Sequence, residues 1–220
     1  MKQSGSSGAP ALDRPPPHVA NALSLTEDEA EKLSAYVALL RRWQAAINLI
    51  SGKTLIDIWD RHILDCGQLR EHVPDGSTAI ADIGSGAGLP GIILSIMGIG
   101  PITLIESDNR KAAFLQTVIG ELGLTASVAP VRAETMPEEQ FDLIAARAVA
   151  PLDGLIQLTA PLLKTGGKLL ILKGKTHQEE LTAAGKNWTI DAQTFSSRTD
   201  PAARILLIEN IRPNDERIAP

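Results

Sequence analysis

A glycine-rich segment directly after a short apolar run restricts this chain more than any other feature. Residues 81–91 read ADIGSGAGLPG, with four glycines in the last eight positions, and an apolar stretch, GIILSIM, follows. A strand, a glycine loop and a helix in this order are typical of parallel α/β sheets, which bind ligands at the C-terminal ends of their strands. Glycine suits such a loop because it has no Cβ to obstruct a ligand and adopts positive φ at no steric cost.

Predicted strands and helices continue to alternate along the rest of the chain. A parallel sheet built with right-handed crossovers is therefore expected. Its last two strands have only a short turn between them, which predicts an antiparallel hairpin. We expect a seven-stranded, Rossmann-like α/β fold with strands at 78–83, 102–107, 127–134, 141–148, 166–174, 189–196 and 203–211, and with helices at about 109–122 and 151–163.

Two amphipathic helices are predicted before the first strand. Thr26 and Glu29 have the spacing of a capping box, and a second helix is expected over about 55–73. The preceding leader is rich in Gly, Ser and Pro and is expected to be disordered. The predicted organisation is a leader at 1–23, a helical extension at 24–74 and the α/β domain at 75–220.

Composition indicates the cellular location of the protein and the kinds of site that it can form. The chain has one cysteine, Cys66, and no apolar run approaching 18 residues, so we expect neither a disulfide framework, a metal site nor a membrane span. A cytoplasmic location follows. The net charge of −5 disfavours general coating of nucleic acids but is compatible with a local basic patch.

The glycines can be read in two registers. From Gly86 they match the dinucleotide pattern G-x-G-x-x-G, and from Asp82 they match acid-x-Gly-x-Gly-x-Gly through Gly84, Gly86 and Gly88, typical of S-adenosyl-L-methionine sites. Asp82 suits a ligand that carries an ammonium group. Glu106, at the end of the second strand, can accept from both ribose hydroxyls of either cofactor.

The remaining sequence favours a methyltransferase. The sole tyrosine, Tyr36, lies in the N-terminal helix, where it cannot serve a short-chain dehydrogenase, and 220 residues leave no room for a separate substrate domain. The N/D-P-P-Y/F/W motif is absent, and Cys66 lies outside any Pro-Cys pair. Guanine N7 is compatible with the absence of these motifs. Its lone pair carries no proton, so methylation there requires no general base. A small-molecule or protein methyltransferase, an NAD-binding oxidoreductase and a non-catalytic RNA-binding module remain alternatives.

A series of short motifs occurs in order along the chain. The motifs are INLIS (47–51), RHILDC (61–66), DIGSGAGLPGI (82–92), ESDNRKAAFL (106–115), RAE (132–134), ARA (146–148) and LKG (172–174). Together they closely resemble the ribosomal RNA small subunit methyltransferase G family, also called glucose-inhibited division protein B. The resemblance extends from about residue 25 to the C-terminus and implies N7 methylation of a guanosine in bacterial 16S rRNA, with S-adenosyl-L-methionine as donor.

The resemblance also implies roles for individual residues. Arg147 is expected to face both donor and acceptor, as a positioning group rather than a base, since arginine stays protonated. Ala146 departs from the family, which often has serine there. The donor contacts implied are Gly84 and Leu89 in the glycine loop, and Ala133 and Glu134 beside the adenine.

Basic residues are candidates for contacts with the RNA of a small ribosomal subunit or its assembly intermediate, bound by a monomer. His62 is either a packing residue or a substrate-side group, and Arg61 with Asp65 could form a helix-surface ion pair. The predicted RNA contacts are Arg61, His62, Arg110, Lys111, Lys173, Lys175 and Arg204, with Arg41, Arg42, Lys53 and Arg198 as weaker candidates.

Overall fold

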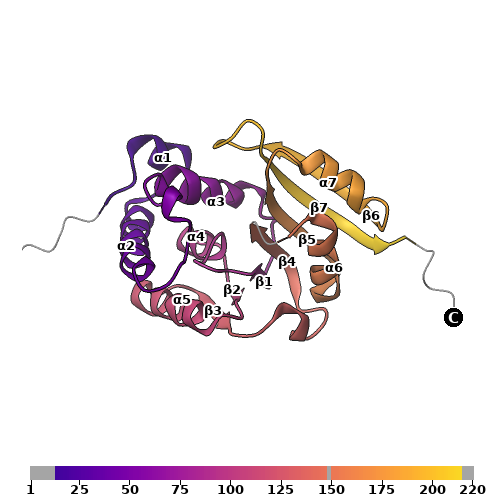
Figure 1. Ribbon diagram of the computed structural model, residues 1–220, viewed down its shortest axis with the longest axis horizontal. Coiled ribbons are helices and arrows are strands. Elements are labelled where there is room, and N and C mark those ends of the chain that lie inside the picture. The colour runs from indigo at the N-terminus through magenta and orange to yellow at the C-terminus, as the bar shows by residue number, and fades with distance from the viewer. Residues whose placement is uncertain (1–12, 148–149, 215–220) are drawn as a thin grey trace, which may run out of the picture.

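The computed structural model describes residues 13–147 and 150–214, which form a seven-stranded sheet between two layers of helices (Figure 1). The strand order is β3-β2-β1-β4-β5-β7-β6, and β7 is antiparallel to both of its neighbours. This confirms the predicted fold. The strands are β1 Ile80–Ile83, β2 Ile102–Ile105, β3 Ala126–Ala129, β4 Phe141–Arg147, β5 Leu163–Lys173, β6 Trp188–Ser196 and β7 Arg204–Pro213.

Helices cover both faces of the sheet, and each face has its own core. Along β1, Ile80 belongs to the core under the N-terminal helices, whereas Ala81 belongs to the core on the other side. Side chains of a strand alternate between faces, so the two buried faces explain why β1 is apolar apart from Asp82. One layer contains α1 Pro17–Ala22, α2 Glu27–Gln44, α3 Asp65–Gly67, α4 Gly91–Ile96 and α5 Asn109–Leu122, and the other contains α6 Leu152–Thr159 and α7 His177–Ala184 (Figure 1).

Local signals set the ends of the longer helices. The Thr26 side chain accepts from the backbone of Glu29, and the Glu29 side chain accepts from the backbone of Thr26, so the predicted capping box is confirmed. Helix α5 begins after Asp108, whose carboxylate accepts from two backbone amides, and it ends at Gly123 in the left-handed conformation.

The structure corrects the predicted leader. Residues 17–22 form α1, and Val19 and Leu23 are buried in the core under the N-terminal helices. The prediction of disorder was therefore wrong for this part, while residues 1–12 lie outside the described residues. Helix α7 was not predicted at all.

The second predicted helix is present in an altered form. A π-helix, Trp59–Leu64, continues into α3 and a 3₁₀ turn that ends at His72. In a π-helix the backbone hydrogen bond spans five residues, and such segments are common at functional sites. Within the described residues, every helix is too short or too polar to cross a bilayer.

Candidate functional site

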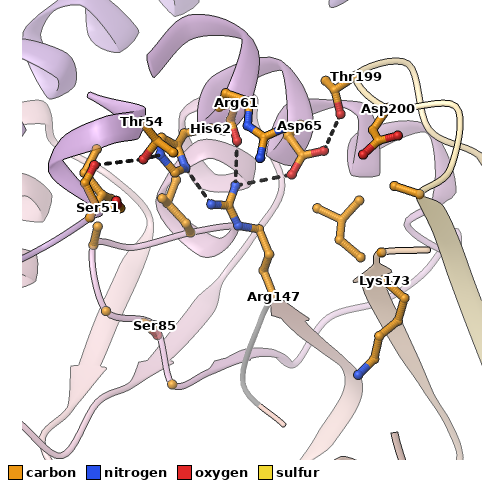
Figure 2. Close-up of a pocket in the computed structure, with 18 of the residues that line it drawn as sticks. Ser51, Thr54, Arg61, His62, Asp65, Ser85, Arg147, Lys173, Thr199 and Asp200 are labelled. Carbon is orange, nitrogen blue, oxygen red and sulfur yellow. Dashed lines mark hydrogen bonds and ion pairs between the residues drawn. The ribbon is translucent and has the colours of Figure 1, made fainter. Parts of the chain in front are cut away.

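The strand order reverses between β1 and β4, and the principal cavity lies at their C-terminal ends. Such a reversal separates the loops that follow the two strands and leaves a crevice between them. The cavity has a volume of about 780 Å³. Figure 2 shows the contributing elements: the π-helix above, the glycine loop on one side, and the ends of β4 and β5 below, with the β6–β7 turn opposite the loop.

The glycine loop is held in a conformation that depends on its glycines. Gly84, Gly86 and Gly88 have φ values of 64°, 56° and 86°, in the left-handed region. The amides of Gly84 and Ser85 donate to the carbonyl of Ile105 at the end of β2. Gly84, Gly86 and Leu89 line the cavity, whereas Gly88 does not. Gly88 packs against α4, where an added Cβ would lie 2.3 Å from Ile92 Cγ1.

Glu106, the residue after β2, supports this loop and does not line the cavity itself. Its Oε2 accepts from the amide of Gly86 at 2.8 Å, and its Oε1 accepts from the amide of Asp108 at 2.8 Å. Each carboxylate oxygen can accept more than one hydrogen bond, so the predicted ribose contact remains compatible with these bonds.

Asp82 is fully buried and does not line the cavity. Its Oδ2 accepts from the amide of Gly91 at 3.0 Å, while its Oδ1 has no hydrogen-bond partner among the described residues. Burial raises the pKa of Asp82 to about 7, against the opposing effect of the Gly91 hydrogen bond. Because this oxygen is buried and outside the cavity lining, the structure places Asp82 behind the glycine loop, where it holds the start of α4 through Gly91.

Arg147 connects the end of β4 to the π-helix. Its guanidinium donates to the carbonyl of Arg61 at 3.1 Å, to Asp65 Oδ2 at 3.3 Å and to His62 (Figure 2). It also donates to Cys66 Sγ at 3.4 Å. The Arg147 side chain is 18% exposed and also lines the cavity. It therefore combines a structural ion pair with a position at the site.

The hydrogen bonds of His62 define its tautomer. Arg147 can only donate, so Nδ1 of His62 accepts, and Nε2 donates to Thr54 Oγ1 at 2.8 Å. Thr54 in turn donates to the carbonyl of Ser51. Burial, together with the nearby Arg147 and Arg61, lowers the pKa of His62 to about 4, so the imidazole is neutral near pH 7.

Asp65 joins three parts of the chain. Besides Arg147, it accepts from Thr199 Oγ1 at 2.6 Å and from Gln68 Nε2 at 3.2 Å. The ion pair suggested between Arg61 and Asp65 does not form, because Asp65 turns to Arg147 instead. In the π-helix, residues four apart do not have the relationship that they have in an α-helix.

Lys173 lines the cavity, but its ammonium group is engaged within the protein. Nζ donates to the carbonyl of Ala150 at 2.6 Å and to Glu180 Oε2 at 2.7 Å, and the side chain is 10% exposed. The pair links β5 to α7, the helix that sequence reasoning missed. This geometry favours a structural function for Lys173 over contact with phosphate.

The other predicted residues divide between the cavity and its surroundings. Arg61 and His62 line it. Arg110 and Lys111 line a separate cavity of about 340 Å³ between the end of α2 and the start of α5. Ala133 is buried and Glu134 is exposed, and neither of them borders the principal cavity. Lys175 and Arg204 also lie outside it, next to the lining residues Gly174 and Ala203.

The strand order and the glycine loop at the switch point define the Rossmann-like fold of class I methyltransferases. Solved structures with this fold include a predicted O-methyltransferase from Agrobacterium tumefaciens, with a TM-score of 0.53 and 20% identity over 67% of this chain and 82% of that one. TYW2 of M. jannaschii in complex with AdoMet has a TM-score of 0.55 and 12% identity, covering 77% of this chain and 80% of that one.

The family follows from closer relatives. Residues 29–204 match the family model described as rRNA small subunit methyltransferase G, and the chain belongs to that family. The protein of that name from Acidiphilium cryptum is 51% identical over 82% of this chain and 84% of its own. The one from Rhodospirillum centenum is 43% identical over 90% of this chain and 91% of its own. The oxidoreductase alternative is not favoured by these relationships.

Sequence reasoning missed several residues of the site. Tyr36 donates a 2.7 Å hydrogen bond to the carbonyl of Ala87 in the glycine loop. From the sequence, this tyrosine only argued against a short-chain dehydrogenase. Thr54 and Thr199 carry no motif of their own. Their proximity to motifs, three residues after INLIS and at the predicted hairpin turn, was the available signal.

Proposed function

We propose that the protein transfers the methyl group of S-adenosyl-L-methionine to N7 of a specific guanosine in bacterial 16S rRNA. Its family relationships support the reaction, and the cavity between the glycine loop, Arg147 and the N-terminal helices supports the site. The donor supplies an electrophilic methyl group, and guanine N7 supplies a lone pair that carries no proton.

The observation that carries this proposal is that the titratable groups around Arg147 are already engaged. Both ring nitrogens of His62 have partners, and Asp65 accepts from Arg147 and Thr199. Burial raises the pKa of Cys66 to about 12, so its thiol stays protonated. These groups are therefore poorly suited to act as a general base for an acceptor that must lose a proton. Guanine N7 needs only positioning and a suitable electrostatic environment.

Within this proposal, the donor is held by the glycine loop, in the register that the sequence associates with S-adenosyl-L-methionine. Gly84, Gly86 and Leu89 form the cavity wall, and Glu106, which holds the Gly86 amide, would accept from the ribose. Asp82 acts from behind the loop, where it accepts from the Gly91 amide at the start of α4. The adenine would lie beside Ala133 and Glu134, outside the cavity described above. Gly88 shapes the loop from within. Arg147 positions the guanine and compensates charge, without acting as a base.

Ion pairing selects among the candidate RNA contacts. Arg41, Arg42 and Arg198 form ion pairs with acidic residues. The side chains of Lys53 and Arg61 form no ion pair within the described residues, and Lys53 lies between the cavity-lining Ser51 and Thr54. Arg110 pairs with Asp108 at 3.8 Å, and the Arg204 guanidinium donates to the carbonyls of Pro201 and Ala203. We assign the phosphate contacts around the cavity to Lys53, Arg61 and Lys175, with Lys111 as a more distant contact.

The substrate is 16S rRNA within the small subunit or an assembly intermediate, and the enzyme acts as a cytoplasmic monomer. The helical extension at 24–74 forms the acceptor side of the cavity, and the domain at 75–220 forms the donor side. Analytical ultracentrifugation of the free protein checks the monomer.

The test is to map 7-methylguanosine in 16S rRNA by mass spectrometry, with and without the gene. One guanosine should lose its methyl group in the deletion strain, and purified enzyme with labelled donor should restore it. Parallel reactions with naked rRNA and 30S particles identify the substrate form. Arg147→Lys should fail to restore methylation, while Arg70→Lys, a change outside the cavity, should restore it. An unchanged 7-methylguanosine profile in the deletion strain would refute the acceptor.

A further inference from the structure

Tyr36 makes a direct contact between the N-terminal helical unit and the donor loop. Its hydroxyl lies 2.7 Å from the carbonyl oxygen of Ala87, a residue 51 positions later, and both residues are buried. Burial raises the pKa of Tyr36 well above its usual range, so the hydroxyl remains a proton donor at any pH relevant to the enzyme.

The other hydrogen bonds of the loop come from β1, from the end of β2 and from within the loop. Gly84 and Ser85 donate to Ile105, and Gly86 donates to Glu106. Gly91 donates to Asp82, and the Ser85 carbonyl accepts from Gly88 and Leu89. None of these bonds involves the Ala87 carbonyl. Tyr36 holds the part of the loop where Ala87 lies between two glycines with positive φ. A segment rich in glycine retains conformational freedom that such external bonds must remove.

We infer that Tyr36 is a positioning residue of the donor site, which fixes the Ala87 peptide and thereby the part of the loop that lines the cavity. The inference rests on the proposed function only for the identity of the donor. It assigns to the helical unit a function in donor binding, in addition to covering the acceptor side.

The hydroxyl and the ring of Tyr36 can be separated experimentally. The ring lies 6.5 Å from the ring of Phe114 and contributes to the core between α2 and α5. Tyr36→Phe keeps this packing and removes only the hydrogen bond, so the buried Ala87 carbonyl loses its donor. A matched control is Ser34→Ala in the same helix, which removes a buried hydroxyl whose 2.7 Å bond to Ala30 stays within α2.

Two measurements test the inference. Hydrogen–deuterium exchange of the ligand-free proteins should show faster exchange in residues 84–91 for Tyr36→Phe, with α5 unchanged, and no such effect for Ser34→Ala. Calorimetric titration with S-adenosyl-homocysteine should show a dissociation constant raised about tenfold for Tyr36→Phe. For Ser34→Ala it should stay within about twofold of the wild type.

The inference is overturned if Tyr36→Phe behaves as Ser34→Ala does in both measurements, or if exchange accelerates throughout the molecule rather than in the loop. Methylation of rRNA by the wild type is scored separately. A wild type that binds S-adenosyl-homocysteine but leaves rRNA unmethylated would refute the acceptor and leave the Tyr36 comparison intact.

Discussion

Arg147 Nη2 lies 2.5 Å from Nδ1 of His62, and this contact requires the imidazole to be neutral. Arginine has no acceptor atom, so a proton on Nδ1 would place two donors face to face. His62 therefore orients Arg147 rather than acting as an acid or a base. Protonation of the His62 ring would therefore break this contact and release the Arg147 guanidinium.

The first prediction concerns the pH dependence of stability. The unfolded chain takes up a proton on His62 near pH 6.5, whereas the folded chain does so only near pH 4. Between these values the unfolded state binds more protons, so the free energy of unfolding falls as the pH is lowered. We expect the wild type to lose about 2 kcal/mol more than His62→Asn between pH 7 and 4.5.

Asparagine retains an acceptor near the position of Nδ1 and does not titrate, which makes it the suitable replacement. Urea unfolding at several pH values measures the difference, and His18→Asn, at an exposed position, is the control. Parallel pH profiles for the wild type and His62→Asn would show that the imidazole does not titrate as proposed.

The second prediction distinguishes two lysines at the end of β5. Lys173→Met removes the partner of Glu180 and should lower the free energy of unfolding by about 1–2 kcal/mol, while the salt dependence of RNA binding stays unchanged. Lys175→Met should leave stability unchanged but reduce the slope of log K against log salt by about one unit. Chemical denaturation and RNA-binding titrations at several salt concentrations check both, and the reverse pattern would restore Lys173 as a phosphate contact.

The third prediction concerns two glycines of the donor loop. Both have positive φ, so replacement by alanine costs about 1–2 kcal/mol of backbone strain at either position. At Gly88 the new Cβ would also lie 2.3 Å from Ile92 Cγ1, whereas at Gly86 the nearest atom is 3.7 Å away. We expect Gly88→Ala to be less stable than Gly86→Ala by about 2 kcal/mol in urea unfolding. Equal free energies of unfolding for the two variants would mean that α4 can move away from the new Cβ without loss of stability.

The fourth prediction has the opposite pH dependence from the first. Asp82 has a folded pKa of about 7, above its ordinary value, so the folded state binds more protons between pH 4 and 7. Its contribution to stability is present at low pH and is lost as the pH rises through 7. The wild type should lose about 2 kcal/mol more than Asp82→Asn between pH 5 and 8. Unfolding titrations at both pH values decide this, and equal losses would place the titration elsewhere.

Much of the fold could be predicted because local signals and burial agree. Helix α5 was placed correctly from end to end, since Asp108 and Gly123 mark its limits. Helix α1 was missed because it is only six residues long and begins at the last of three consecutive prolines, while tertiary contacts of Val19 stabilise it. Helix α7 was missed because Ala184 is its sole buried residue, which leaves no periodic pattern to detect.

The site was less accessible to sequence reasoning, since its interactions join distant segments. Arg147 could be placed at the end of a strand, but its contact with His62 depends on a π-helix that no spacing predicted. Lys173 had the expected position and a different partner, because Glu180 lies on the unpredicted helix. The contact of Tyr36 with Ala87 could not be inferred from either residue type.

The bonds to Asp65 also determine when the site can form during synthesis. Asp65 accepts from Arg147, 82 residues later, and from Thr199, 134 residues later. Contacts between positions so far apart in sequence form late and slowly in folding. A nascent chain that ends before residue 199 can contain the whole glycine loop and still lack the completed cavity. The enzyme therefore acquires its site only after the chain has been translated beyond residue 199.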